Sequence, residues 1–237
     1  MKFTLSTFKT KQNIGKKPVV IKTVVTSDLG AAIAEKHGAE VIQVLTGFRF
    51  IGEKITEFEN AKKAGDETNG KDYLIGYEES YGYLVGTHAR DKDSVVASML
   101  IAEMTAYYKK EGKTLIDALE ALYQEYGYYL DVVDSFTLQG KEGLERIAAI
   151  MSELRAAPSV YPGQKEVLDY KDGLNGLPPS NVLKFILQDG TWIVARPSGT
   201  EPKLKFYYGI KAENRESASA LLEKLRKTVY EAKGLKK

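Results

Sequence analysis

Residues 19–25 constrain the fold of this chain more than any other segment. Nearly all of them are β-branched, and Lys22 is the exception. A strand that is apolar on both faces is typical of a parallel sheet covered by helices on both sides. Short apolar segments follow at 39–45 and 73–76, and stretches with a helical pattern separate them. Strands that alternate with helices in this way predict a βαβ layered domain.

Two helical segments follow this layer and close the first domain. Thr114 and Asp117 have the spacing of a capping box, which predicts that a helix begins there. Gly127 suits the residue that ends it. We therefore expect an exposed lead-in at 1–17, an α/β domain at 18–128 and a second domain at 129–237.

The second domain has a different pattern of elements. A helical stripe runs from Leu144 to Leu154, and Asp189-Gly190 between two apolar segments is a strong hairpin signal. A further strand at 204–210 and a final helix capped by Asn214 complete the order. This order predicts an α+β domain, an antiparallel sheet with helices on one face. Prolines and glycines between 162 and 179 predict an irregular segment in the middle.

Composition excludes several functions. Lysine and arginine number 34 against 32 acidic residues, so the net charge of +2 gives no reason to expect nucleic acid or an anionic membrane as a partner. There is no apolar run long enough to span a membrane and no secretory signal, so we expect a cytoplasmic protein. The chain has no cysteine and two histidines, so thiolate and cysteine–zinc chemistry are excluded.

The segment 196–203, with the sequence RPSGTEPK, concentrates groups that bind phosphate. Arginine binds phosphate oxygens bidentately, and hydroxyls donate to the others. A glycine lets backbone N–H groups turn inward around an anion. The alternative is a solvated loop with scattered charges. The expected phosphate-binding residues are Arg196, Ser198, Gly199, Thr200 and Lys203.

The segment 76–82, GYEESYG, follows a predicted strand directly. The carboxyl ends of strands are where open α/β sheets place their ligands. Glu78 can accept hydrogen bonds from the vicinal hydroxyls of a sugar. Glu78 and Glu79 together could instead ligate Mg²⁺, but such a site needs more oxygen ligands than the sequence offers here. A polar turn is equally compatible with the pattern.

Two further segments carry weaker signals. Asp93 is best explained as a helix N-cap, and Lys92 could reach an anion held near Glu78. Thr46 stands at a strand-to-helix turn, where a hydroxyl and N–H groups can meet a ligand. His88 is better explained as a surface or supporting residue than as a metal ligand, because the sequence shows no partner ligands for it.

These segments together resemble a known family. The segments 196–203 and 76–80 resemble the phosphate-binding and sugar-binding loops of the α-D-phosphohexomutases, and 46–52 and 90–93 resemble substrate segments of their third domain. The order and spacing match from about Pro18 onward. The chain is most similar to the bacterial phosphoglucomutase branch, and it resembles the C-terminal half of such an enzyme, domains 3 and 4. The resemblance implies a Rossmann-like domain followed by a TATA-box-binding-protein-like domain.

The resemblance also implies roles for individual residues. Glu78 and Ser80 would hold sugar hydroxyls, and Thr46 and Lys92 would touch the bound sugar phosphate. Lys22 sits near a family lysine that approaches the ligand, and the role of Arg49 is left open. The family's phosphoserine loop and Mg²⁺ loop are not found in this sequence, so it supplies no catalytic residue and no metal ligand.

As a full-length enzyme, such a protein would be an intramolecular phosphotransferase that interconverts glucose 1-phosphate and glucose 6-phosphate. The resemblance implies Mg²⁺ as its cofactor and glucose 1,6-bisphosphate as activator and intermediate. Its partners would be the sugar phosphate and the missing N-terminal domains, and the fragment alone would be inactive. The alternatives are a phosphomannomutase or phosphopentomutase of the same superfamily, and a stand-alone sugar-phosphate-binding module.

Overall fold

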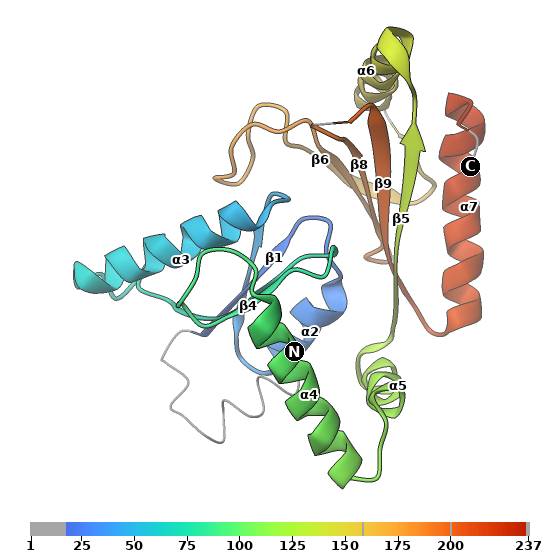
Figure 1. Cartoon of the computed structure of the whole chain (residues 1–237). Coiled ribbons are helices and arrows are strands. Elements are labelled where there is room, and N and C mark those ends of the chain that lie inside the picture. Colours follow the sequence, from blue (N-terminus) through green and yellow to red (C-terminus); the bar gives the residue numbers. More distant parts are fainter. Residues whose placement is uncertain (1–17, 158, 200, 236–237) are drawn as a thin grey trace. The chain divides into compact units, whose positions relative to one another are not determined.

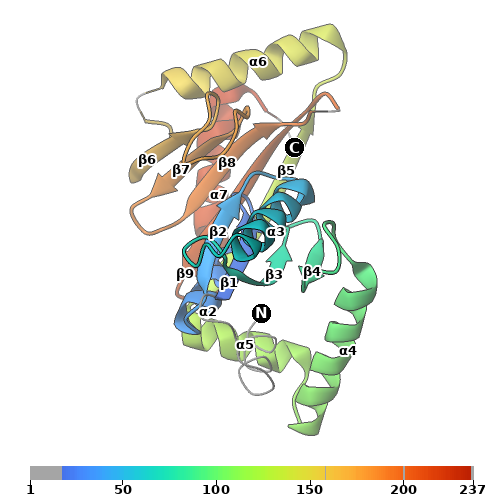
Figure 2. The ribbon, with the colours of Figure 1, turned by 90° about the vertical axis from the view of Figure 1, so that its left-hand side faces the viewer.

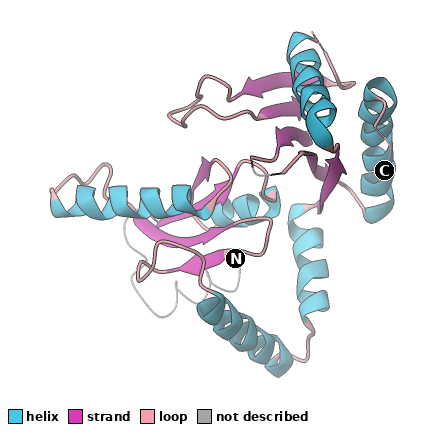
Figure 3. Cartoon of the chain, turned by 45° about the horizontal axis from the view of Figure 1, so that its top comes forward, coloured by secondary structure: helices cyan, strands magenta, loops and turns pink. Residues whose placement is uncertain are grey.

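The computed structural model describes residues 18–157, 159–199 and 201–235, and the predicted lead-in 1–17 lies outside them. The chain divides into two compact units between Tyr126 and Gly127. This division falls two residues before the end of the expected first domain. Each unit combines helices with one sheet of its own (Figures 1 and 3).

The first unit contains a four-stranded sheet in the order β2-β1-β3-β4. Its strands are β1 (Pro18–Thr23), β2 (Glu40–Val44), β3 (Asp72–Tyr77) and β4 (Tyr83–Val85). Strand β1 pairs in parallel with both β2 and β3, whereas β4 runs antiparallel to β3. Because β1 lies inside the sheet and is buried from Val19 onward, its run of β-branched residues has apolar neighbours on both faces.

Helices cover both faces of this sheet. The helices of the first unit are α2 (Asp28–Lys36), α3 (Phe48–Lys63), α4 (Ser94–Lys110) and α5 (Leu115–Tyr126). Ile75 of β3 packs in one apolar cluster with Ile33 of α2, whereas a Cβ on neighbouring Gly76 would lie 2.6 Å from Ile51 of α3. Successive residues of a strand point to opposite faces, so α2 and α3 lie on opposite sides of the sheet (Figure 2).

The second unit contains a five-stranded antiparallel sheet in the order β5-β9-β8-β7-β6. Its elements are β5 (Tyr128–Thr137), α6 (Gly140–Ala156), β6 (Gln164–Asp169), β7 (Leu183–Leu187), β8 (Trp192–Pro197), β9 (Lys203–Ala212) and α7 (Arg215–Lys233). Ile150 of α6 and Leu225 of α7 share one core cluster with Phe206 of β9. Both helices therefore cover the same face of the sheet, as expected for an α+β domain.

One expectation about this unit is wrong. Strand β6 forms inside the segment that was expected to be irregular, and it pairs with β7 at the edge of the sheet. Most of its side chains are exposed or half-buried, so it lacks the apolar alternation that marks a strand in sequence. Edge strands of this kind are stabilised by one ladder of backbone hydrogen bonds.

In the part of the chain that the structure describes, no helix combines the length and apolar character that a membrane crossing requires.

Candidate functional site

The Arg196 loop, residues 196–203, joins β8 to β9. Arg196 pairs directly with Lys205 across these strands, and the amide of Ser198 donates to the carbonyl of Lys203 at 2.8 Å. The Lys203 ammonium lies 2.7 Å from a carboxylate oxygen of Glu201, and this contact lowers the pKa of Glu201. A backbone hydrogen bond thus closes the turn, and its charged side chains lie near the end of β8 and the start of β9.

The cations of the Arg196 loop gather on one face of the sheet. Residues paired across an antiparallel ladder share a face, and so do residues two apart on one strand. Arg196, Lys203 and Lys205 therefore lie on the same side, together with Tyr207, whose hydroxyl accepts from Arg196 at 3.5 Å. The alternate residues of β9 pack in the core with α6 and α7. The cationic cluster thus lies on the face that these two helices leave uncovered.

Gly199 and Thr200 are the predicted phosphate-binding residues at the middle of the Arg196 loop. Gly199 is exposed, its backbone lies outside the left-handed region, and an added Cβ would meet no described atom within 4 Å. This conformation does not itself require glycine, and the predicted inward turn of N–H groups stays a prediction. Thr200 lies outside the described residues.

The Glu78 loop, residues 78–82, joins β3 to β4. Glu78 is half-buried, and its Oε1 accepts a hydrogen bond of 3.0 Å from the amide of Gly47 at the start of α3. The Glu78 amide donates to the carbonyl of Gly82 at 2.9 Å, which closes the loop. The carboxylate is therefore held at a helix N-terminus, where the helix dipole favours negative charge.

The pKa of the Glu78 carboxyl is raised, and burial is the largest cause. Desolvation raises the pKa of its carboxyl, the hydrogen bond from Gly47 lowers it, and the nearby Glu79 charge raises it. Lys92 also lowers the Glu78 pKa, and Asp91 raises it. A carboxylate oxygen accepts about two hydrogen bonds, so Glu78 keeps capacity for further donors after its bond to Gly47.

The shape of the Glu78 loop depends on a close approach at Gly82. An added Cβ there would lie 2.9 Å from Oε2 of Glu78 and 3.2 Å from the Lys92 side chain. The same contacts show that Glu78 and Lys92 are neighbours. That Lys92 reaches an anion held near Glu78 stays a prediction. Ser80 is exposed in this loop, and Thr46 is half-buried next to Gly47. The structure therefore gathers the predicted sugar-contact residues Thr46, Glu78 and Lys92 around one helix end.

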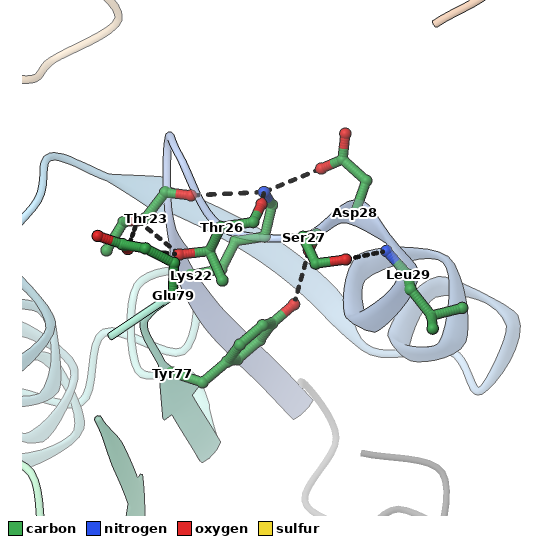
Figure 4. Close-up of polar contacts among 8 residues, drawn as sticks. All are labelled: Lys22, Thr23, Thr26, Ser27, Asp28, Leu29, Tyr77 and Glu79. Carbon is green, nitrogen blue, oxygen red and sulfur yellow. Dashed lines mark hydrogen bonds and ion pairs between the residues drawn. The ribbon is translucent and has the colours of Figure 1, made fainter. Parts of the chain in front are cut away.

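Lys22 is the predicted substrate contact with the most buried position. Its side chain has no exposure, and its ammonium lies 2.9 Å from Asp28 and 2.5 Å from the carbonyl of Thr26 (Figure 4). A direct contact with a ligand would require the ammonium to exchange these partners. Its role in binding stays a prediction.

His88 and Asp93 form a supporting contact beside this region. Asp93 caps α4 by accepting from the amides of Val95 and Val96, as expected. Its other carboxylate oxygen lies 2.9 Å from Nε2 of His88. These contacts lower the pKa of Asp93, with His88 as the largest cause.

Arg49 lies in a different place from the Glu78 loop. It lines a surface cavity of about 520 Å³ together with Arg90 and polar side chains of α3. Arg90 is engaged there by Thr56 and Glu59. The cavity walls carry positive and negative side chains. The lining residues are Arg49, Gly52, Glu53, Thr56, Glu57, Asn60 and Arg90.

The described residues do not fit a magnesium site. Across these ranges, no three histidine or acidic side chains come together closely enough to hold a metal ion. Glu78 and Glu79 are adjacent, but Glu78 accepts from a backbone amide and Glu79 from threonine hydroxyls. Mg²⁺ prefers octahedral oxygen coordination, which these two diverging carboxylates do not offer.

Three features that shape the Glu78 loop and the Arg196 loop were not predicted from the sequence. They are the Gly47 amide that binds Glu78, the close approach at Gly82, and Lys205 opposite Arg196. The first two depend on contacts between distant segments and leave no local signal. Lys205 could have been found, because the alternation of Lys203 and Lys205 in a predicted strand places both on one face.

Comparison with known proteins places this arrangement in a family. A family model described as phosphoglucomutase/phosphomannomutase, alpha/beta/alpha domain III, matches residues 3–126. A second, described as the phosphoglucomutase/phosphomannomutase C-terminal domain, matches residues 109–227. The chain belongs to the phosphoglucomutase/phosphomannomutase family. The predicted resemblance and the predicted fold class are both confirmed.

Curated relatives give the finer comparison. A phosphoglucomutase of Staphylococcus haemolyticus (strain JCSC1435) is 37% identical over 221 residues, which cover 87% of this chain and 38% of that protein. A phosphoglucomutase of Staphylococcus aureus (strain USA300) is 36% identical over 210 residues, covering 83% of this chain and 36% of that protein. The chain thus spans little more than a third of the length of these relatives.

Solved structures share the fold. The open form of the Paramecium phosphoprotein parafusin, a phosphoglucomutase, matches with a TM-score of 0.65 at 19% identity, over 91% of this chain and 38% of that one. A phosphoglucomutase/phosphomannomutase family protein of Burkholderia thailandensis matches with a TM-score of 0.59 at 16% identity, over 98% of this chain and 40% of that one. At these identities the likeness establishes the fold alone.

Proposed function

We propose that this chain is the substrate-binding C-terminal part of a phosphoglucomutase. The whole enzyme interconverts glucose 1-phosphate and glucose 6-phosphate by way of a bisphosphorylated sugar. In this proposal the first unit binds sugar hydroxyls, and the second unit binds a phosphate. Membership of the family and the similarity to named phosphoglucomutases support it.

The observation that carries the proposal is the cationic cluster of the Arg196 loop. Arg196 and Lys205 lie directly opposite each other across β8 and β9, and Lys203 shares their face. Like charges placed opposite each other destabilise a sheet unless an anion lies between or above them. A phosphate accepts bidentate hydrogen bonds from arginine and point-charge contacts from lysine. The cluster is therefore suited to hold a phosphate that is not being transferred.

Glu78 supplies the complementary contact in the first unit. It is half-buried, held by Gly47 at the start of α3, and keeps lone pairs for donors. Vicinal hydroxyls of a sugar are such donors, whereas a free phosphate anion is repelled by the carboxylate. In our proposal Ser80, Thr46 and Lys92 assist this contact, and Lys22 acts in the same region.

The chemistry of phosphoryl transfer lies outside this chain in our proposal. In-line transfer depends on positioning and on charge stabilisation, and this chain supplies positioning. The longer protein would provide the phosphoserine and would hold Mg²⁺. It would act in the cytoplasm, with glucose 1,6-bisphosphate as intermediate and activator. By itself, this chain would bind ligand without turnover.

An NMR titration of backbone amides tests the proposal. Inorganic phosphate should shift amides of the Arg196 loop and leave Gly47 and Glu78 unchanged. Glucose 1,6-bisphosphate should shift both regions, because it adds hydroxyls to the phosphate. Mannose 1-phosphate and ribose 1-phosphate serve as competitors, and tighter binding of either one would change the assignment to a phosphomannomutase or a phosphopentomutase.

Two results would contradict the proposal. The first is that neither region responds to any of these ligands at millimolar concentration, which would show that this chain does not bind sugar phosphates. The second is that the pure chain interconverts the glucose phosphates in a coupled assay, which would place catalytic groups within it.

A further inference from the structure

Glu79, next to the proposed sugar contact Glu78, is held by a hydrogen-bonded network at the end of β1 (Figure 4). Its Oε2 lies 3.3 Å from Oγ1 of Thr23 and 3.3 Å from Oγ1 of Thr26. The two threonine hydroxyls are 2.6 Å apart, and both threonines are buried. A carboxylate from one loop thus joins a hydroxyl pair from another.

The number of protons defines how this network works. Two hydroxyl protons serve three contacts, so one threonine donates to the other while the second donates to Glu79. Hydrogen bonds in such a chain polarise and strengthen one another. The charged acceptor at the end of the chain makes the last bond stronger than one between neutral groups.

Lys22 holds the turn that carries the threonines. Its ammonium donates to the carbonyl of Thr26 at 2.5 Å and lies 2.9 Å from the carboxylate of Asp28. The amide of Thr26 donates to the carbonyl of Thr23 at 3.2 Å. A buried charge with a partner and several hydrogen bonds is costly to displace, so the turn between β1 and α2 is a firm attachment point.

A second tether comes from the other neighbour of Glu78. The hydroxyl of Tyr77 donates to the carbonyl of Ser27 at 3.3 Å. Only a glycine at position 30 leaves room for the Tyr77 ring, because an added Cβ would lie 2.2 Å from the hydroxyl. Tyr77 and Glu79 thus both attach to the segment between β1 and α2. Glu78, between them, contacts Gly47 of a different segment instead.

We propose that Glu79 is a positioning residue, which aims Glu78 at the sugar by binding the Thr23–Thr26 hydroxyl pair. The geometry assigns the two adjacent carboxylates different tasks. Glu79 binds the protein, and Glu78 keeps its remaining lone pairs for ligand hydroxyls. The inference rests on the proposed function, because aiming Glu78 matters only if Glu78 binds the sugar.

The bond from the Gly47 amide to Glu78 provides a readout of this aim without any ligand. In the wild-type chain, the Gly47 amide proton should shift as the Glu78 carboxyl titrates. In Glu79→Met, which keeps the volume and removes the acceptor, the amplitude of that shift should fall at least by half. The dissociation constant for glucose 1,6-bisphosphate should rise about tenfold, as expected for loss of one charged hydrogen bond. The dissociation constant for inorganic phosphate should not change.

Two variants separate positioning from charge and from general damage. Glu79→Gln keeps an acceptor for the threonine hydroxyls and should restore most of the Gly47 amplitude. Asp91→Asn removes another negative charge that acts on Glu78, and it should leave the amplitude unchanged. If Glu79→Met does not fold, the double variant Thr23→Val and Thr26→Val removes both hydroxyls that face Glu79 with nearly the same shape, and it should give the same loss.

The outcomes distinguish this inference from the proposed function. Full amplitude at Gly47 in Glu79→Met or in the Thr23→Val and Thr26→Val double variant would overturn the positioning role, and so would a Gln variant as poor as the Met variant. Failure of wild-type protein to bind glucose 1,6-bisphosphate would overturn the proposed function, while the Gly47 titration would still decide whether Glu79 positions Glu78.

Discussion

The Glu78 loop and the Arg196 loop both follow strand ends, but different forces hold them. The Glu78 loop is fastened by Gly47, by the threonine pair at Glu79 and by close packing at Gly82. The Arg196 loop brings like charges together on the sheet face opposite to α6 and α7. In our proposal, the first loop is formed before a ligand arrives, whereas the cation cluster of the second is completed by the charge of its ligand.

The difference matches the chemistry of the two proposed ligand groups. Sugar hydroxyls are neutral and are distinguished by direction, so their acceptor must be aimed in advance. A phosphate is charged and nearly symmetrical, so a cluster of cations can bind it with less demand on direction. The two regions can be tested against each other by variants that act on one of them only.

The largest effect is expected where the first loop is anchored. Lys22→Met removes the counter-charge of Asp28 and the donor to Thr26, so it should lower the free energy of unfolding of the first unit by about 2–4 kcal/mol. Urea denaturation followed by NMR signals of that unit measures this. Trp192, the single tryptophan, reports the second unit, which should be unaffected.

Lys36→Met is the matched control for Lys22. Lys36 makes a largely exposed ion pair with Glu125, so its loss should cost less than about 1 kcal/mol. If both variants lower the free energy of unfolding equally, burial of the Lys22 ammonium does not add to stability. Lys22 would then not anchor the first loop.

The second largest effect is expected on anion binding by the Arg196 loop. Arg196→Ala removes a charge-assisted bidentate contact, which should weaken phosphate binding by about 1.5–3 kcal/mol. Folding stability should hardly change, because the variant also relieves repulsion from Lys205. Calorimetric titration with phosphate measures the first effect, and thermal denaturation measures the second.

Arg215→Ala is the control for this variant. It makes the same change of charge, but Arg215 follows the far end of β9 and lies over the ring of Tyr128. Phosphate affinity should stay within about twofold of wild type. An Arg196→Ala chain that unfolds yet still binds phosphate would mean that the Arg196 loop has a structural role only.

Glycine substitutions compare the packing of the two loops directly. Gly82→Ala forces a Cβ against Glu78, so it should cost about 1–2 kcal/mol of stability and weaken binding of glucose 1,6-bisphosphate. Gly199→Ala places its Cβ in open space and should cost less than about 0.5 kcal/mol. Thermal denaturation of both variants gives the comparison, and the reverse order would contradict it.

The smallest effect is a difference in pH dependence. Burial raises the pKa of Glu78, so the folded state holds its proton to higher pH, and stability falls as pH rises from the ordinary glutamate range through that raised pKa. Lys203 lowers the pKa of Glu201, so stability there is present above the ordinary range and is lost as pH falls through the lowered pKa. Glu78→Gln and Glu201→Gln should therefore change the slope of stability against pH with opposite signs, and equal signs would be inconsistent with this assignment.

Local signals in the sequence predicted much of the fold. The reciprocal bonds between Thr114 and Asp117 form the expected capping box, and Gly190 adopts the left-handed backbone of the expected turn between β7 and β8. The run at 19–25 predicted a strand buried on both faces, which β1 is. Each of these features is set by residues a few positions apart.

The parts that the sequence did not reveal depend on long-range contacts. Glu79 meets Thr23 from 56 residues away, and Glu78 meets Gly47 from 31 residues away. Edge strand β6 is stabilised by pairing with β7 and not by a pattern of its own. Such features follow from the folded arrangement of the sheet, and a single sequence carries no local trace of them.

Amide hydrogen exchange with and without phosphate tests most directly whether one loop is preformed and the other is completed by its ligand. Our account predicts that the Gly47 amide is protected without ligand and unchanged by phosphate. It also predicts that the amides of Gly199 and Glu201 exchange quickly without an anion and slow at least tenfold when phosphate saturates the Arg196 loop. A Gly47 amide that gains protection with phosphate while the Gly199 and Glu201 amides do not change would contradict the account.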